Sequence, residues 1–135
     1  MKTLVIGYGN DLRSDDGAGR VVADRVGELG LSGVSVRSLS QLTPELALEI
    51  AEVDCVVFVD ASVSVDKPAL SSVEPRAFGD SAVSHFTDPG VLLGMTATVG
   101  SVPQRAYLVS IPVVSLDLGL ELSMVTAQAV EVAVA

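Results

Sequence analysis

The residues with the greatest chemical potential lie in a glycine-rich and aspartate-rich turn near the amino terminus, Gly7-Tyr8-Gly9-Asn10-Asp11-Leu12-Arg13-Ser14-Asp15-Asp16-Gly17-Ala18-Gly19. Paired carboxylates suit a divalent cation, because the ion offsets their mutual repulsion and glycines allow tight backbone paths. In the alternative interpretation, Asp15 and Asp16 only cap the following helix by accepting its free amide protons. One aspartate suffices for a cap, and spacing alone leaves both interpretations open.

A nucleotide site in this turn is disfavoured. The dinucleotide fingerprint Gly-x-Gly-x-x-Gly needs a third glycine for close packing of helix on strand, and Leu12 stands in that place. A phosphate would also be repelled by the carboxylates of Asp11, Asp15 and Asp16. A small nucleotide-binding domain is therefore the third functional hypothesis.

Two further candidate residues lie far from this turn in the sequence. Asp60 follows the apolar run 56–59, which predicts a central strand buried on both faces. If that strand runs parallel to the first, Asp60 faces the same crevice as the turn. The alternative interpretation of Asp60 is a turn residue bonded to nearby backbone. His85, the single histidine, lies at a loop-to-helix junction, where histidine is usually structural or exposed.

Taken together, Asp16, Asp60 and His85 predict a metal site. Two carboxylates and one imidazole from separate segments form a facial ligand set with open positions, suited to nickel, zinc, manganese or iron. Spacing does not show that the three side chains converge. Other hydrolytic motifs, the Gly-x-Ser-x-Gly elbow and His-Glu-x-x-His, do not occur. Cys55 begins the most buried strand and is expected to behave as a small apolar residue.

The elements that must position these residues alternate between strands and helices, which favours parallel pairing through crossover connections. Apolar periodicity and stop signals predict strands over residues 3–6, 34–39, 56–59, 70–74 and 105–111. They predict helices over residues 18–29 and 123–135. Two further helices are predicted, one from Thr43-Pro44-Glu45 to about residue 51 and one from Pro89 to about residue 98. The predicted cap of the helix that begins at Pro89 is Thr87 or Asp88. Residues 61–84 form the least regular stretch, which suits a lid, a partner surface or a plain connection.

Composition indicates one globular domain over residues 1–135, with nearly half of the residues apolar. The net charge of −9 argues against nucleic acid and against an anionic membrane surface as partners. A single cysteine excludes an internal disulfide, and no signal peptide or membrane-spanning run is evident. We therefore expect a cytoplasmic protein.

The chain resembles the hydrogenase maturation proteases, the endopeptidases that finish the large subunit of nickel-iron hydrogenases. The first and most specific matching motif is the glycine-aspartate turn. The others follow in the family's order, and the resemblance reaches from residue 1 to about 125: Gln41-Leu42-Thr43-Pro44-Glu45, Phe58-Val59-Asp60-Ala61, and Ser84-His85 with Asp88-Pro89 and Leu92-Leu93.

The resemblance implies a three-layer α/β/α sandwich of the phosphorylase/hydrolase type, with a mixed five-stranded sheet whose antiparallel strand lies near residues 70–74. It implies that Asp16, Asp60 and His85 bind metal, with catalysis not separable from metal recognition. Asp16 is the shorter of the two acids that the family uses at its position.

The implied activity is removal of a carboxyl-terminal extension from the nickel-loaded large-subunit precursor. The implied cofactor is nickel supplied by that precursor, with other divalent ions as possible substitutes, and the implied protein is a monomer. The alternative from another class is a noncatalytic chaperone module that senses the nickel site without cutting.

Overall fold

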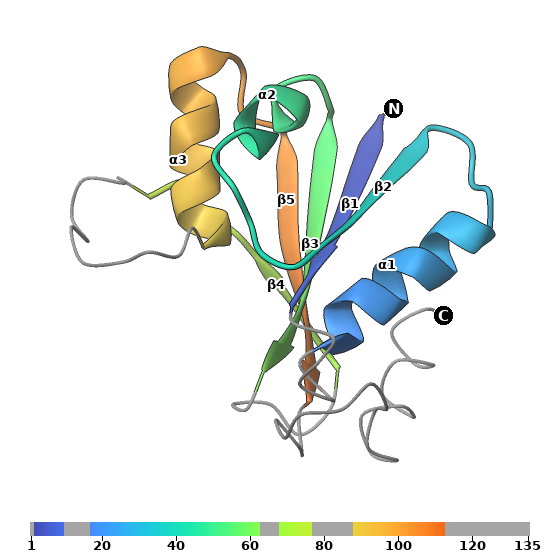
Figure 1. Cartoon of the computed structure of the whole chain (residues 1–135). Helices are drawn as coiled ribbons and strands as arrows, with labels where there is room; N and C mark the ends of the chain where they lie inside the picture. The colour runs from blue at the N-terminus through green and yellow to red at the C-terminus, as the bar shows by residue number, and fades with distance from the viewer. Residues whose placement is uncertain (1, 10–16, 63–67, 77–87, 113–135) are drawn as a thin grey trace.

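A mixed five-stranded sheet forms the middle of the structure, a computed structural model that describes residues 2–9, 17–62, 68–76 and 88–112 (Figure 1). The strand order is β2-β1-β3-β5-β4, and β4 alone runs antiparallel to its neighbour. The strands are β1 (Thr3–Tyr8), β2 (Val34–Leu39), β3 (Cys55–Ser62), β4 (Ala69–Ser72) and β5 (Arg105–Pro112). The predicted sheet with one antiparallel strand is confirmed.

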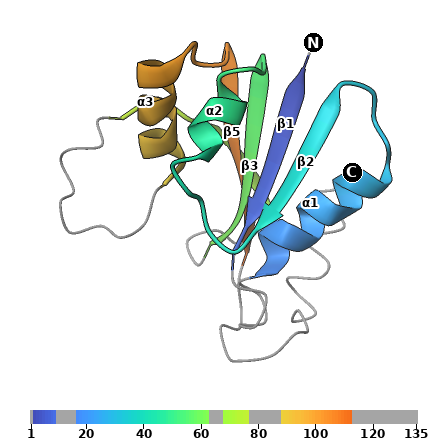
Figure 2. The same ribbon diagram turned by 45° about the horizontal axis from the view of Figure 1, so that its top comes forward.

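Helices cover both faces of this sheet, as Figures 1 and 2 show. One face carries α1 (Ala18–Glu28), and the other carries α2 (Leu46–Ile50) and α3 (Pro89–Val99). Each parallel crossover returns the chain to the same end of the sheet, so the carboxyl ends of β1, β3 and β5 lie at one edge. The three-layer prediction is confirmed.

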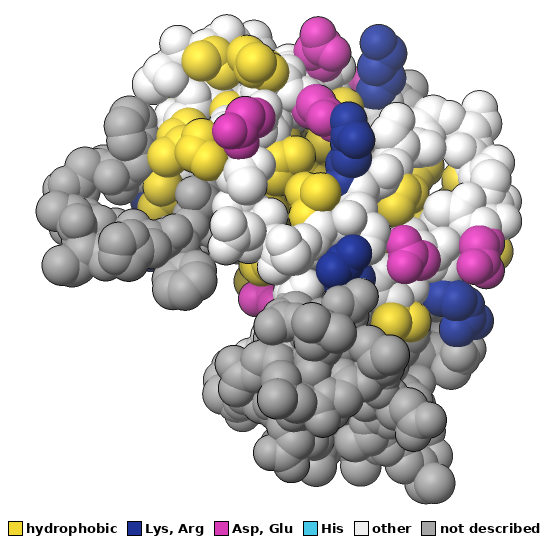
Figure 3. All heavy atoms as spheres, viewed as in Figure 1, with side chains coloured by type: hydrophobic (Ala, Val, Ile, Leu, Met, Phe, Trp, Pro, Cys, Tyr) yellow, Lys and Arg dark blue, Asp and Glu magenta, His cyan; other side chains and the backbone are white. Residues whose placement is uncertain are grey.

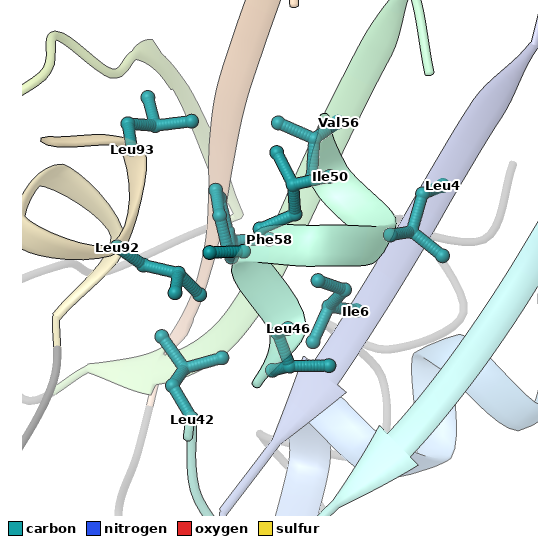
Figure 4. Close-up of a cluster of buried hydrophobic side chains, with 10 residues drawn as sticks. Leu4, Ile6, Leu42, Leu46, Ile50, Val56, Phe58, Leu92 and Leu93 are labelled. Atoms are coloured by element: carbon teal, nitrogen blue, oxygen red, sulfur yellow. The ribbon is translucent and has the colours of Figure 1, made fainter. Parts of the chain in front are cut away.

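The core explains why β1 and β3 occupy the middle of the sheet. Successive strand residues point to opposite faces, so a strand buried on both faces reads as a continuous apolar run. Leu4, Ile6 and Phe58 are buried in the layer shared with α2 and α3, shown in Figure 4. Val5 and Val59 are buried in the layer beneath α1. Each such side chain stabilises the fold by about 1.5–3 kcal/mol.

Four element boundaries differ from the sequence prediction by two residues or more. β1 ends at Tyr8 and not at Ile6. β3 continues two residues past Asp60 to Ser62, because the parallel ladder with β5 extends to Pro112. The predicted strand over 70–74 is β4, which ends at Ser72. The second helix begins at Leu46 and not at Pro44, because residues 43–45 form a turn whose carbonyls accept hydrogen bonds from residues 46–48. The predicted helix over 123–135 lies outside the described residues.

The first turn of α1 lies directly on the backbones of β1 and β3. A Cβ atom at Gly19 would lie 2.3 Å from the carbonyl oxygen of Val59 and 2.9 Å from that of Tyr8. A Cβ atom at Gly7 would lie 2.1 Å from the carbonyl oxygen of Gly19. The absence of both side chains is therefore what permits this helix-to-sheet distance.

We expect Gly19→Ala to lower the free energy of unfolding by about 1–3 kcal/mol or more, because the added methyl overlaps backbone that cannot move aside. Gly27→Ala is the matched control within the same helix. Its Cβ would lie an ordinary 3.7 Å from Val36, and alanine favours helix over glycine by up to about 1 kcal/mol. Urea denaturation of both variants checks this; equal stabilities for the two variants would contradict the close-contact argument.

Candidate functional site

Asp60 lies near the carboxyl end of the central strand β3, beside Tyr8 at the end of β1. The parallel register pairs Gly7 with Val59, so the next residue of each strand brings Tyr8 alongside Asp60. On its other side Asp60 pairs with Ser110 of β5. Asp60 shares a face with Phe58, two residues earlier, and therefore points to the layer that holds α2 and α3. The alternative prediction of a turn residue is wrong, since Asp60 lies within the ladder.

The Tyr8 hydroxyl donates a hydrogen bond to the Asp60 carboxylate. Burial raises the pKa of the Tyr8 phenol above its ordinary value of about 10, and the negative charges of Asp60 and Asp88 raise it further. Tyr8 also packs against the hydrophobic core beneath α2 and α3. A proton-bearing, half-buried phenol therefore lies between a carboxylate of β3 and the beginning of α3.

Asp88 begins α3 and connects it to the segment that follows β4. Its Oδ1 atom accepts a hydrogen bond of 2.8 Å from the Val91 amide, which caps the helix. Its Oδ2 atom accepts from the Arg76 guanidinium, and the Arg76 amide donates to the Gly90 carbonyl at 2.8 Å. Of the two predicted caps for this helix, Thr87 or Asp88, the structure shows Asp88.

The beginning of α1 lies at the same edge of the sheet. Gly17 immediately precedes the helix, and the backbone of Gly19 contacts that of Val59, the residue before Asp60. The ends of β1 and β3 and the first turns of α1 and α3 therefore meet around Tyr8 and Asp60. Open α/β sheets bind their ligands at this kind of edge.

Of the three residues predicted to bind metal, the structure describes Asp60 alone. Asp16 and His85 lie outside the described residues, as do Asp11 and Asp15. In the sequence, Asp16 directly precedes Gly17 and His85 comes three residues before Asp88. Within the described ranges, histidine, cysteine and acidic side chains form no group of three that could hold a metal ion. The convergence of the three ligands stays a prediction.

Sequence reasoning did not identify Tyr8 or Arg76 as residues of this edge. Tyr8 lies inside the glycine-rich motif, and only the strand register places its hydroxyl beside Asp60. Arg76 lies in the irregular stretch of the chain, and its pairing with Asp88 depends on the path of the backbone after β4. The one signal available for Tyr8 was an aromatic hydroxyl two residues after the strand predicted over residues 3–6.

Two other features do not form part of this site. Cys55 is buried at the opposite end of β3, and burial raises the pKa of its thiol, which disfavours a reactive thiolate. Cavities of about 410 Å³ around Lys2, Val34 and Glu52 and of about 250 Å³ around Pro75 and Arg105 are lined largely by residues near the amino ends of parallel strands. They lie away from Asp60.

Surface charge and helix length bear on nucleic acid and membrane as partners, both of which the sequence argues against. On the face shown in Figure 3, basic and acidic side chains of the described residues are interspersed and form no continuous basic patch. An example is the ion pair between Arg37 of β2 and Glu49 of α2. No helix in the described part of the chain is long and apolar enough to cross a bilayer.

Comparison with solved structures shows that the fold is that of hydrogenase maturation proteases. The [NiFe] hydrogenase maturation protease HycI from Thermococcus kodakarensis KOD1 superposes with a TM-score of 0.77 at 23% identity, over 98% of this chain and 87% of its own. The hydrogenase maturating endopeptidase HybD from Escherichia coli gives 0.75 at 21% identity, over 99% and 88% of the two chains.

The hydrogenase 2 maturation peptidase from Thaumarchaeota archaeon SCGC_AB-539-E09 gives a TM-score of 0.72 at 25% identity, over 99% of this chain and 93% of its own. No family model and no curated protein matches the sequence. The structural neighbours thus support the resemblance indicated by the motifs, and they do so across nearly the whole chain.

We expect Tyr8 to make the protein lose stability at alkaline pH. Above about pH 10 the unfolded chain releases the phenolic proton while the folded chain retains it, so stability falls by about 1.4 kcal/mol per pH unit from this group. Urea denaturation between about pH 9 and 11 should show a shallower loss for Tyr8→Phe than for the wild type. Identical slopes for the two proteins would contradict the raised pKa.

We expect Asp88→Ala to lower the free energy of unfolding by about 1 kcal/mol, because α3 loses its cap. Asp88→Asn should retain most of that stability, since asparagine caps as well as aspartate and the lost ion pair joins side chains that are 62% and 46% exposed. Thermal denaturation distinguishes the two. A loss as large for Asn as for Ala would show that the pairing with Arg76, and not the cap, dominates.

Proposed function

We propose that this chain is an endopeptidase that removes a carboxyl-terminal extension from the nickel-loaded large subunit of a nickel-iron hydrogenase. The observation that carries the proposal is the match of fold to three maturation proteases over 98–99% of the chain. The turn at residues 7–19 and the Asp60 and His85 motifs support it independently, because they were identified from the sequence without the fold.

Asp16, Asp60 and His85 are proposed to recognise the nickel that the precursor brings. The described part of the site is consistent with this role. Asp60 is a carboxylate at the ligand-binding edge of the sheet, where it accepts a hydrogen bond from Tyr8, and a carboxylate oxygen can bind an ion as well as accept hydrogen bonds. Two carboxylates and an imidazole would occupy part of the coordination sphere and leave positions for groups of the substrate.

Because the substrate carries the metal, cleavage of the precursor would depend on whether nickel has been inserted into it. An empty precursor presents no ion, so the three side chains have nothing to bind and the two proteins lose those contacts. Specificity is then a difference between two affinities, set by the metal and not by the peptide sequence alone. Other divalent ions with similar ligand preferences could substitute at this position.

The chemical step is hydrolysis of one peptide bond. Water adds to the carbonyl carbon, the carbon–nitrogen bond breaks, and the leaving amine takes a proton. A carboxylate of this set, as in an aspartyl protease, could accept the proton of the attacking water. Coordination to a metal would make that water more acidic. We assign the pair of functions, recognition and water activation, to Asp16, Asp60 and His85 jointly.

The proposed partner is the large-subunit precursor, and neither nucleic acid nor a membrane is proposed as a partner. We propose that the protein is monomeric and cytoplasmic. The net charge of −9 suits a basic or cationic partner more than an anionic one.

The proposal predicts that Asp16→Ala, Asp60→Ala and His85→Ala each abolish processing of the nickel-loaded precursor while the protein stays folded. Asp24→Ala, which removes an exposed carboxylate from α1, is the matched control and should cut normally. Incubation of each purified variant with loaded precursor, followed by mass measurement of the large subunit, checks this. Normal cleavage by the three site variants would rule out the proposed ligand set.

The same experiment separates the protease from the noncatalytic chaperone. A chaperone that senses the nickel site would bind the loaded precursor without shortening it. A wild-type protein that forms the complex but leaves the large subunit at full length would therefore favour the chaperone and contradict the endopeptidase.

A further inference from the structure

Tyr8 links the elements that meet at the proposed nickel contact. Tyr8 ends β1 and donates a hydrogen bond to Asp60 of β3. It also lies close enough to Asp88, at the start of α3, for that negative charge to raise the pKa of its phenol. Its ring packs against the core beneath α2 and α3. This packing holds the Tyr8 ring in place, and its hydroxyl is directed at Asp60, the one residue of the proposed ligand set that the structure describes.

The hydrogen bond from the Tyr8 hydroxyl is suited to fixing the orientation of the Asp60 carboxylate. An aspartate side chain can rotate, and a carboxylate offers about four lone-pair directions to an ion. A hydrogen bond from a fixed donor to one of these directions restricts the rotation of the carboxylate. Groups that hold metal ligands in this way commonly contribute about 10–100-fold to metal affinity or activity.

A purely structural role for the Tyr8 hydroxyl makes a different prediction. A phenylalanine could fill the same space against the core, so the packing of the ring does not require the oxygen atom. The oxygen contributes the bond to Asp60, and that bond acts on a side chain whose proposed role is to meet an ion. The two roles can therefore be separated by removing the hydroxyl alone.

We propose that Tyr8 is a positioning residue that holds the Asp60 carboxylate in the orientation needed to contact the nickel of the precursor. The inference rests on the proposed function, because it gives Asp60 that contact. It extends the site by a residue that does not itself bind the ion. A tyrosine here sets how well the protein distinguishes a loaded precursor from an empty one.

The test measures binding of nickel-loaded and nickel-free precursor to the immobilised protein, in the first seconds of contact and before cleavage. The ratio of the two affinities reports the contribution of the metal contact. Tyr8→Phe should reduce this ratio by about 10–100-fold. Asp60→Ala should bring it close to one. Tyr107→Phe, which removes a hydroxyl from β5, is the matched control and should keep the wild-type ratio.

A structural role would weaken binding of both precursor forms alike and leave their ratio unchanged, and that result would overturn the inference. If Asp60→Ala loses the preference while Tyr8→Phe keeps it, Tyr8 has no positioning role and the proposed function stands. If the wild type shows no preference for the loaded precursor, nickel recognition fails and the role of Tyr8 fails with it.

Discussion

The contact between the first turn of α1 and the backbones of β1 and β3 is the constraint on which the arrangement of the site depends. Gly7 and Gly19 have no side chains where the first turn of the helix meets the sheet, so the backbone of Gly19 lies against the Val59 carbonyl. The helix must therefore begin beside the residue that precedes Asp60. This contact brings the end of the glycine-aspartate turn to the carboxyl edge of the sheet, where Tyr8 and Asp60 already lie side by side.

Most of the fold could be predicted from the sequence because its signals are local. The apolar runs of β1 and β3 and the alternation of β2 each follow from burial on two faces or on one. The boundaries that were wrong depend on partners elsewhere in the chain. β3 is lengthened by its ladder with β5, and α2 is shortened by the turn at residues 43–45. No property of either segment alone specifies those partners.

The site was less predictable for the same reason. Asp60 could be identified because it follows a buried strand at the end expected to face the acidic turn, but its neighbour Tyr8 follows only from the register of β1 against β3. Leu12 stands where the dinucleotide fingerprint has the glycine that permits close packing of helix on strand. The structure shows that Gly7 and Gly19 provide this packing instead, in a turn without the phosphate-binding pattern. An acidic turn and a tightly packed helix are therefore compatible.

The central claim is that Asp16, Asp60 and His85 contact the nickel of the precursor together. X-ray absorption at the nickel edge, on loaded precursor frozen rapidly with and without this protein, tests it most directly. We predict additional oxygen and nitrogen neighbours around nickel in the mixture, and their loss when Asp60→Ala replaces the wild type. A nickel environment unchanged by the wild-type protein, in a sample where the complex has formed, would contradict the account.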